Sequence, residues 1–134
     1  MKKIFTTYLF LIFINYGFSQ SPEKISYQAI IRNSSNVLVS NQSVGMRISI
    51  LQGSTSGSSV YTETHTPTTN LNGLVSVEIG GGTVVSGLMS SVNWENGPYY
   101  IKTETDPTGG ISYSITGISQ LLSVPFALHA KTVE

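Results

Sequence analysis

The sequence of 134 residues lacks several groups on which whole classes of protein depend. It has no cysteine, which excludes disulfide bonds, a thiol nucleophile and thiolate ligands for zinc. Charged residues make up only 10% of the chain, against about 25% in typical globular proteins. The 7 basic and 7 acidic residues cancel, so the sequence offers no electrostatic basis for binding nucleic acid. Beyond residue 20, no apolar run is long enough to cross a membrane as a helix.

The first residues have the three-part pattern of a secretory signal peptide. A positive start at Lys2 and Lys3 is followed by an uncharged apolar run over residues 4–18, and small residues stand at Gly17 and Ser19. A membrane anchor would need about 20 apolar residues, and this run is shorter and interrupted by polar ones. We therefore predict a signal peptide over residues 1–19, cleavage after Ser19, and one domain over residues 20–134.

The rest of the chain is rich in hydroxyl groups, with 20 serines and 14 threonines, and it alternates apolar and polar residues with the period of a β-strand. The expected strands are residues 24–32, 44–51, 60–66, 74–79, 99–105 and 111–116, with a bulge at Gly117 and a resumed strand over 118–124. Turn signals separate them, of which Asn72-Gly73 is typical of a hairpin. One short helical turn is expected within residues 88–94, and residues 124–130 fit either an edge strand or a terminal turn. This pattern predicts an antiparallel sandwich or barrel of about seven strands.

Candidate catalytic and metal-binding residues are few. Glu63 and His65 lie on one face of an expected strand, but two ligands fall short of the three that a zinc site needs, so we expect a solvated strand face. A Ser-His-Asp triad would have to use Asp106, the one aspartate, which precedes a proline in a turn where we expect it to bond its own backbone. We therefore expect no catalytic residue, no metal site and no cofactor, and a protein that is not an enzyme.

The aromatic residues around the Trp-Glu-Asn-Gly-Pro-Tyr-Tyr segment have two interpretations. Trp94 and Tyr99 would fill the core of a sandwich, since Tyr99 falls on the inward register with Ile101. Tyr100 falls on the opposite face and is the better candidate for a surface residue. In the alternative interpretation, Tyr100 and Trp94 contact a sugar ring as part of a carbohydrate-binding module.

A long ordered set of motifs resembles a known family. "SYQAIIRN" at residues 26–33 is similar to the "NYQAVVRN" opening of a domain widespread in secreted proteins of Bacteroidetes and flavobacteria. The resemblance continues through "VGMRISILQGS", "GLVSVEIGGG" and "VNWENGPYYIKTETDPTGG". It closes with "SQLLSVPFALHAKTV", which is similar to the family's "QLLSVPYALYAKTA" ending, so that it covers residues 24–134.

The resemblance implies a single antiparallel β-sandwich, Ig-like or prealbumin-like, placed directly after a signal peptide. Such domains precede collagen-like or tail-fibre-like segments, repeat modules or a C-terminal sorting domain, and the family brings no catalytic or ligand residues. This sequence stops at Glu134, where a downstream part would begin, so it is either a stand-alone paralogue or the leading part of a longer protein. We expect an exported, non-catalytic structural or interaction module in the periplasm, at the cell surface or outside the cell. Its partner would be a protein or a downstream domain, with a glycan as the alternative.

Overall fold

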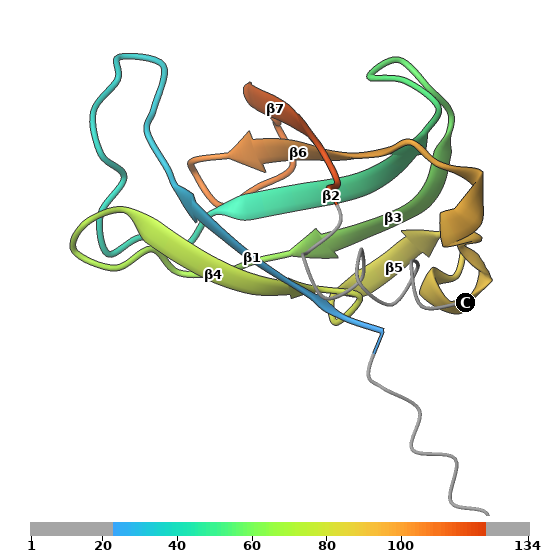
Figure 1. Ribbon diagram of the computed structural model, residues 1–134. Helices are drawn as coiled ribbons and strands as arrows, with labels where there is room; N and C mark the ends of the chain where they lie inside the picture. The colour runs from blue at the N-terminus through green and yellow to red at the C-terminus, as the bar shows by residue number, and fades with distance from the viewer. Residues whose placement is uncertain (1–22, 123–134) are drawn as a thin grey trace, which may run out of the picture.

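The computed structural model describes residues 23–122, which form two layers of β-strands (Figure 1). The elements in chain order are β1 (Ile25–Ile30), β2 (Gly45–Gln52), β3 (Ser59–His65), β4 (Leu74–Ile79), β5 (Thr83–Ser86), the 3-10 turns η1 (Met89–Ser91) and η2 (Trp94–Asn96), β6 (Tyr99–Asp106) and β7 (Ile115–Gln120). Within these residues neither helical turn has the length or apolar character to cross a membrane. The predicted signal peptide at residues 1–19 and the segment 124–130 lie outside the described residues.

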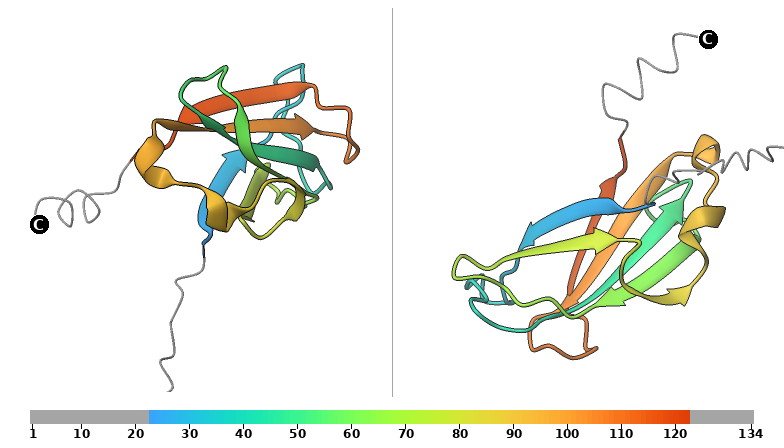
Figure 2. Two further views of the ribbon diagram at one scale, coloured as in Figure 1. Left: turned by 90° about the vertical axis from the view of Figure 1, so that its right-hand side faces the viewer. Right: turned by 90° about the horizontal axis from the view of Figure 1, so that it is seen from below.

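All strand pairs are antiparallel, and they make one large and one small sheet. The large sheet has the order β5-β3-β2-β6-β7, and the small one pairs β1 with β4. Figure 2 shows the small sheet packed across one face of the large one. The predicted β-sandwich is therefore confirmed. Its strands divide five and two, whereas constant-type immunoglobulin domains divide them four and three, so the likeness lies in the architecture.

The core forms because alternate residues of facing strands are apolar. On β2, Met46, Ile48 and Ile50 point inward and are at most 1% exposed. On β4, Val75 and Ile79 meet them from the other layer and are equally buried. Each such side chain contributes about 1.5–3 kcal/mol when it leaves water, so this central stripe supplies much of the driving force for folding.

One strand was missed, and two local predictions were wrong. The exposed strand β5 was not expected, and it pairs with β3 after the glycine turn. A strand was expected over residues 111–116, but Ile111 is 83% exposed outside any strand, and β7 begins only at Ile115. Gly117 forms no bulge, because it pairs with Thr103 and the register between β6 and β7 is unbroken on both sides of this pair. The helical turn predicted within residues 88–94 is confirmed by η1, and the structure adds a second turn, η2, that begins at Trp94.

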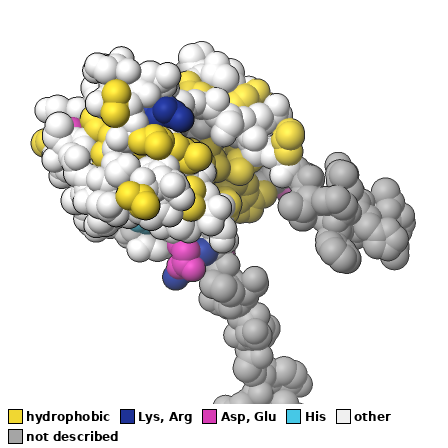
Figure 3. All heavy atoms as spheres, turned by 90° about the vertical axis from the view of Figure 1, so that its left-hand side faces the viewer, with side chains coloured by type: hydrophobic (Ala, Val, Ile, Leu, Met, Phe, Trp, Pro, Cys, Tyr) yellow, Lys and Arg dark blue, Asp and Glu magenta, His cyan; other side chains and the backbone are white. Residues whose placement is uncertain are grey.

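The two long sides of the sandwich are closed to different degrees. On β4, which lies toward β3, every inward side chain is buried. On β1 the inward residues Ile25, Tyr27 and Ala29 are only half-buried. On β7, across the gap from β1, Ile115 is half-buried and Ser119 is exposed. We call the β3–β4 side the closed side and the β1–β7 side the open side. Figure 3 shows hydrophobic side chains at the bottom of a hollow between the layers.

Candidate functional site

The best-defined polar cluster of the described residues is centred on a buried carboxylate. Glu63 lies on β3 between Tyr61 and His65, and all three side chains point to the same face because they alternate along a strand. Glu63 pairs with Ile48 of β2, whose side chain is in the core. The strand therefore carries Glu63 into the core, where its exposed fraction is 0%.

Four donors satisfy this carboxylate. The hydroxyl of Tyr61 donates to Oε2 at 2.7 Å, and Nε2 of His65 lies 2.7 Å from Oε1. The backbone N–H groups of Gly80 and Gly82 each donate at 3.0 Å. Because both glycines lie in the turn that leads from β4 to β5, the carboxylate ties the small sheet to the large one on the closed side.

The glycine turn has a shape that leaves no room for a side chain. Gly80 has φ of +97°, and a Cβ atom there would overlap the backbone oxygen of Glu23. At Gly82 a Cβ atom would lie 2.6 Å from Nε2 of His65. Glycine is therefore required at both positions for the backbone to come close to the carboxylate.

The expectation of a solvated face at Glu63 and His65 was wrong. Glu63 is fully buried and the side chain of His65 is only 13% exposed. The physical reason is that the glycine turn covers this end of β3 and supplies backbone donors that replace water. Among residues 23–122, no group of three potential metal-ligating side chains comes together.

The hydrogen bonds set the ionisation of the cluster. Burial alone raises the pKa of Glu63, but the donors His65 and Tyr61, joined by the glycine amides, outweigh it and hold the pKa below the usual 4.5. Burial, together with its bond to the carboxylate, raises the pKa of Tyr61 to about 12. At neutral pH the cluster therefore contains a carboxylate and a neutral phenol.

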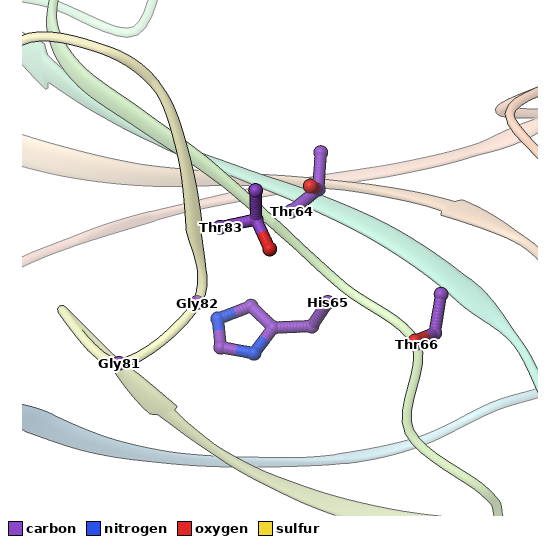
Figure 4. Close-up of a pocket in the computed structure, with 6 residues that line it drawn as sticks. All are labelled: Thr64, His65, Thr66, Gly81, Gly82 and Thr83. Atoms are coloured by element: carbon purple, nitrogen blue, oxygen red, sulfur yellow. The ribbon is translucent and has the colours of Figure 1, made fainter.

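A shallow pocket of about 330 Å³ lies beside this cluster and is lined by Thr64, His65, Thr66, Gly81, Gly82 and Thr83 (Figure 4). The imidazole lies between the glycine turn and Thr66 in this view. A buried acid and the histidine that it orients are two of the three members of a catalytic triad. No hydrogen bond within the described part of the chain joins His65 to a hydroxyl group, and its Nε2 is paired with Glu63.

The two surface candidates from the sequence are placed apart. Trp94 was expected in the core, but it is 47% exposed, with its ring set edge-on to Tyr99 at 5.1 Å. Tyr99 is buried as expected and packs in the core beside Ile50. Tyr100 is half-buried and pairs with Leu51 on β2, so it points to the opposite face of the sheet from Tyr99. Trp94 and Tyr100 therefore do not form a single platform.

The other buried acid also serves the backbone. Asp106 is 3% exposed, and one of its oxygens accepts bonds from the backbone and the hydroxyl of Thr108 at 2.9 and 2.6 Å. Its second oxygen accepts from the N–H of Ser112 at 3.0 Å. The hydrogen bonds from Thr108 lower the pKa of Asp106, and the bond from its hydroxyl contributes most. The expectation that Asp106 bonds its own turn is confirmed.

The fold and this cluster define a class, which is an all-β sandwich domain whose buried acids hold turns in place. Residues 26–117 match the model of a family described as a domain of unknown function, DUF8740, and the chain belongs to this family. No curated protein and no solved structure matches the chain.

Proposed function

We propose that the chain is a non-catalytic structural and interaction module of an exported protein. The observation that carries this proposal is the use of Glu63. A buried acid beside a histidine is the group most suited to chemistry in this domain, and four donors from the fold itself occupy its two oxygens. Asp106 is engaged in the same way by its own turn.

A cluster of exposed apolar side chains supports the interaction role. Ile30, Val37, Leu38 and Leu71 are 59%, 57%, 37% and 72% exposed. They lie at one end of the sandwich, where the segment after β1 is held against the turn before β4 by the bond from Ile31 N–H to the oxygen of Gly73. Figure 3 views this end and shows hydrophobic side chains among mostly uncharged ones. Such a surface suits contact with an apolar protein surface better than contact with a charged ligand.

Export is tested by following the native product in cell fractions and culture medium with an antibody to the domain. We expect a processed chain that begins at Gln20 and is found outside the cytoplasm. Leu11→Arg, which breaks the apolar run of the leader, should leave the product unprocessed, whereas Ser34→Arg in an exposed loop should not. An unprocessed cytoplasmic product of the unaltered gene would contradict the proposal.

The interaction role is tested by cross-linking the same cells. The unaltered chain should appear in an assembly larger than the domain, and the double variant Leu38→Asp with Leu71→Asp should lose it, because a charge at each position opposes apolar contact. The control is Ser34→Asp with Asn72→Asp, which adds equal charge at exposed polar positions of the same end. An assembly that survives the first variant, or a free monomer in the unaltered cells, would argue against this role.

A carbohydrate-binding module remains the second candidate, and the observation that favours it is the exposed indole of Trp94 held against Tyr99. Trp94 is the sole tryptophan, so its fluorescence reports on any sugar stacked on it. We would titrate a glycan panel into the purified protein and into Tyr100→Ala. A spectral change that is lost in Trp94→Phe would support this function, and no change with any glycan would dismiss it.

A further inference from the structure

The open side leaves apolar surface and a strand edge without a partner among the described residues. Inward side chains Ile25, Tyr27 and Ala29 of β1 are half-buried, although their neighbours on β4 are buried. The small sheet contains β1 and β4 alone in the described part of the chain, so one edge of β1 is unpaired there. Unpaired strand edges attract a further strand, because their N–H and C=O groups are positioned to bond it.

The chain itself returns to this edge. Leu121 follows β7, and its N–H donates to the oxygen of Tyr99 at 2.9 Å. The side chain of Leu121 packs against the same buried cluster as Ile25, the first residue of β1. The described chain therefore ends on the side of the core where β1 starts.

The sequence of that segment is suited to a strand with one buried face. Phe126, Leu128 and Ala130 alternate with Ala127, His129 and Lys131. Alternation of this kind is typical of a strand that has one face in a core and the other in water. Pro125 comes just before the alternating run, at the first position of a strand, where proline is tolerated.

We propose that residues 126–131 form an eighth strand, which pairs with the free edge of β1 and places Phe126, Leu128 and Ala130 in the hollow of the open side. The layers of a sandwich lie about 10 Å apart, and an extended residue spans about 3.3 Å. Residues 123–125 are therefore enough to cross from β7 to β1. Because the segment starts at the Ile25 end, the new strand runs parallel to β1, which has the same length of 6 residues.

The segment's own covalent attachment favours it over a separate partner. A tethered strand acts at an effective concentration of about a millimolar, which a second copy or another protein would have to exceed. The proposal is independent of the proposed function, which rests on Glu63 and on the cluster at the other end of β1.

Cysteine cross-linking of the full chain tests the pairing directly. The natural sequence has no cysteine, so a pair introduced at Gln28, on the outward face of β1, and at His129 is the only one present. We expect Gln28→Cys with His129→Cys to join within one chain, through a short bismaleimide linker, at every protein concentration. The control pair Ser34→Cys with His129→Cys, whose loop position is away from the strand, should join much less. A dimer as the main product, or equal yields from the two pairs, would overturn the proposal.

Matched charge variants of the full chain provide a second test that needs no cross-link. Leu128→Asp places a carboxylate in the hollow and should lower the thermal midpoint by about 5 °C or more. Ala127→Asp adds the same charge on the outward face and should shift the midpoint much less. Equal shifts for the two variants would show that the segment does not cover the open side and would overturn the proposal.

Discussion

The two long sides of this sandwich differ in how the small sheet is joined to the large one. On the closed side, the carboxylate of Glu63 takes backbone donors from the turn after β4, and the inward residues of β4 are buried. On the open side, the inward residues of β1 are half-buried, and β7 carries the half-buried Ile115 and the exposed Ser119 toward them. The difference shows that a single buried acid can hold two layers together where no strands of those layers pair.

The largest loss of stability is expected when the carboxylate of Glu63 is removed. Glu63→Ala leaves the donors of Tyr61, His65 and the glycine turn buried without an acceptor. We expect the free energy of unfolding to fall by about 3–5 kcal/mol, measured by urea denaturation. The control is Glu78→Ala, which removes an exposed ion pair with Lys24 and should cost less than about 1 kcal/mol. Similar losses of unfolding free energy for the two variants would show that Glu63 does not hold the closed side together.

The glycine turn should be nearly as sensitive. Gly80→Ala combines a positive φ with a Cβ atom that meets the backbone of Glu23. Gly53→Ala has a similar φ of +90° but nothing within 4 Å, so it isolates the strain of the backbone. We expect Gly80→Ala to cost about 1–3 kcal/mol more than Gly53→Ala in the same denaturation experiment, because the clash adds to the strain. Equal costs would mean that the turn is free to move away from β3.

The pH dependence of stability should single out the same group. The fold lowers the pKa of Glu63 below its usual 4.5, so the carboxylate stabilises the folded state above that pH, and this contribution is lost as the pH falls through the folded pKa. The stability difference between the natural chain and Glu63→Gln should therefore be constant near neutrality and narrow below about pH 4.5. A difference that does not change on acidification would show that the charge of Glu63 is not what holds the turn.

The smallest effect is expected on the outer face of the large sheet, which belongs to neither side. There Arg47 makes a two-pronged ion pair with Glu104 at 2.7 and 2.9 Å and lies over the ring of Tyr113. The side chain of Arg47 is 40% exposed, so Arg47→Ala should cost about 1 kcal/mol or less and lose part of that cost at high salt. Thermal unfolding at low and high salt measures both. If Arg47→Ala cost as much stability as Glu63→Ala, the outer face of the large sheet would matter to stability as much as the closed side.

The strands of the core could be predicted from the sequence because their patterns are regular. The alternation within residues 24–32 and 74–79 predicted a strand in each, and the structure confirms both as β1 and β4, with burial that alternates along each strand. The strand β5 was missed because its four residues are all exposed and carry two adjacent valines, which show no alternation. The start of β7 was misplaced because the bond from Ser112 to Asp106 lengthens the preceding turn, and a bond between side chain and backbone leaves no periodic signal.

The Glu63 cluster was missed for a related reason. Glu63 and His65 are too few ligands for a zinc site, so the strand that carries both was interpreted as a solvated face. The signal that could have found the cluster is its register, because Tyr61 and Glu63 share a face and the hairpin with β2 places Glu63 opposite Ile48. Three glycines follow β4 in the sequence, but the sequence alone does not show that the amides of Gly80 and Gly82 point to an acid on another strand.

Amide hydrogen exchange of the full chain tests the comparison of the two sides most directly, through the protection of β1 and β4 in the natural chain and in Leu128→Asp. The account predicts that both strands are protected in the natural chain, because residues 126–131 cover the edge of β1 and Glu63 fastens the end of β4. It also predicts that Leu128→Asp removes the protection of those β1 amides that point away from β4, and leaves the protection of β4. Rapid exchange of those β1 amides in the natural chain, or protection of them that Leu128→Asp does not change, would contradict it.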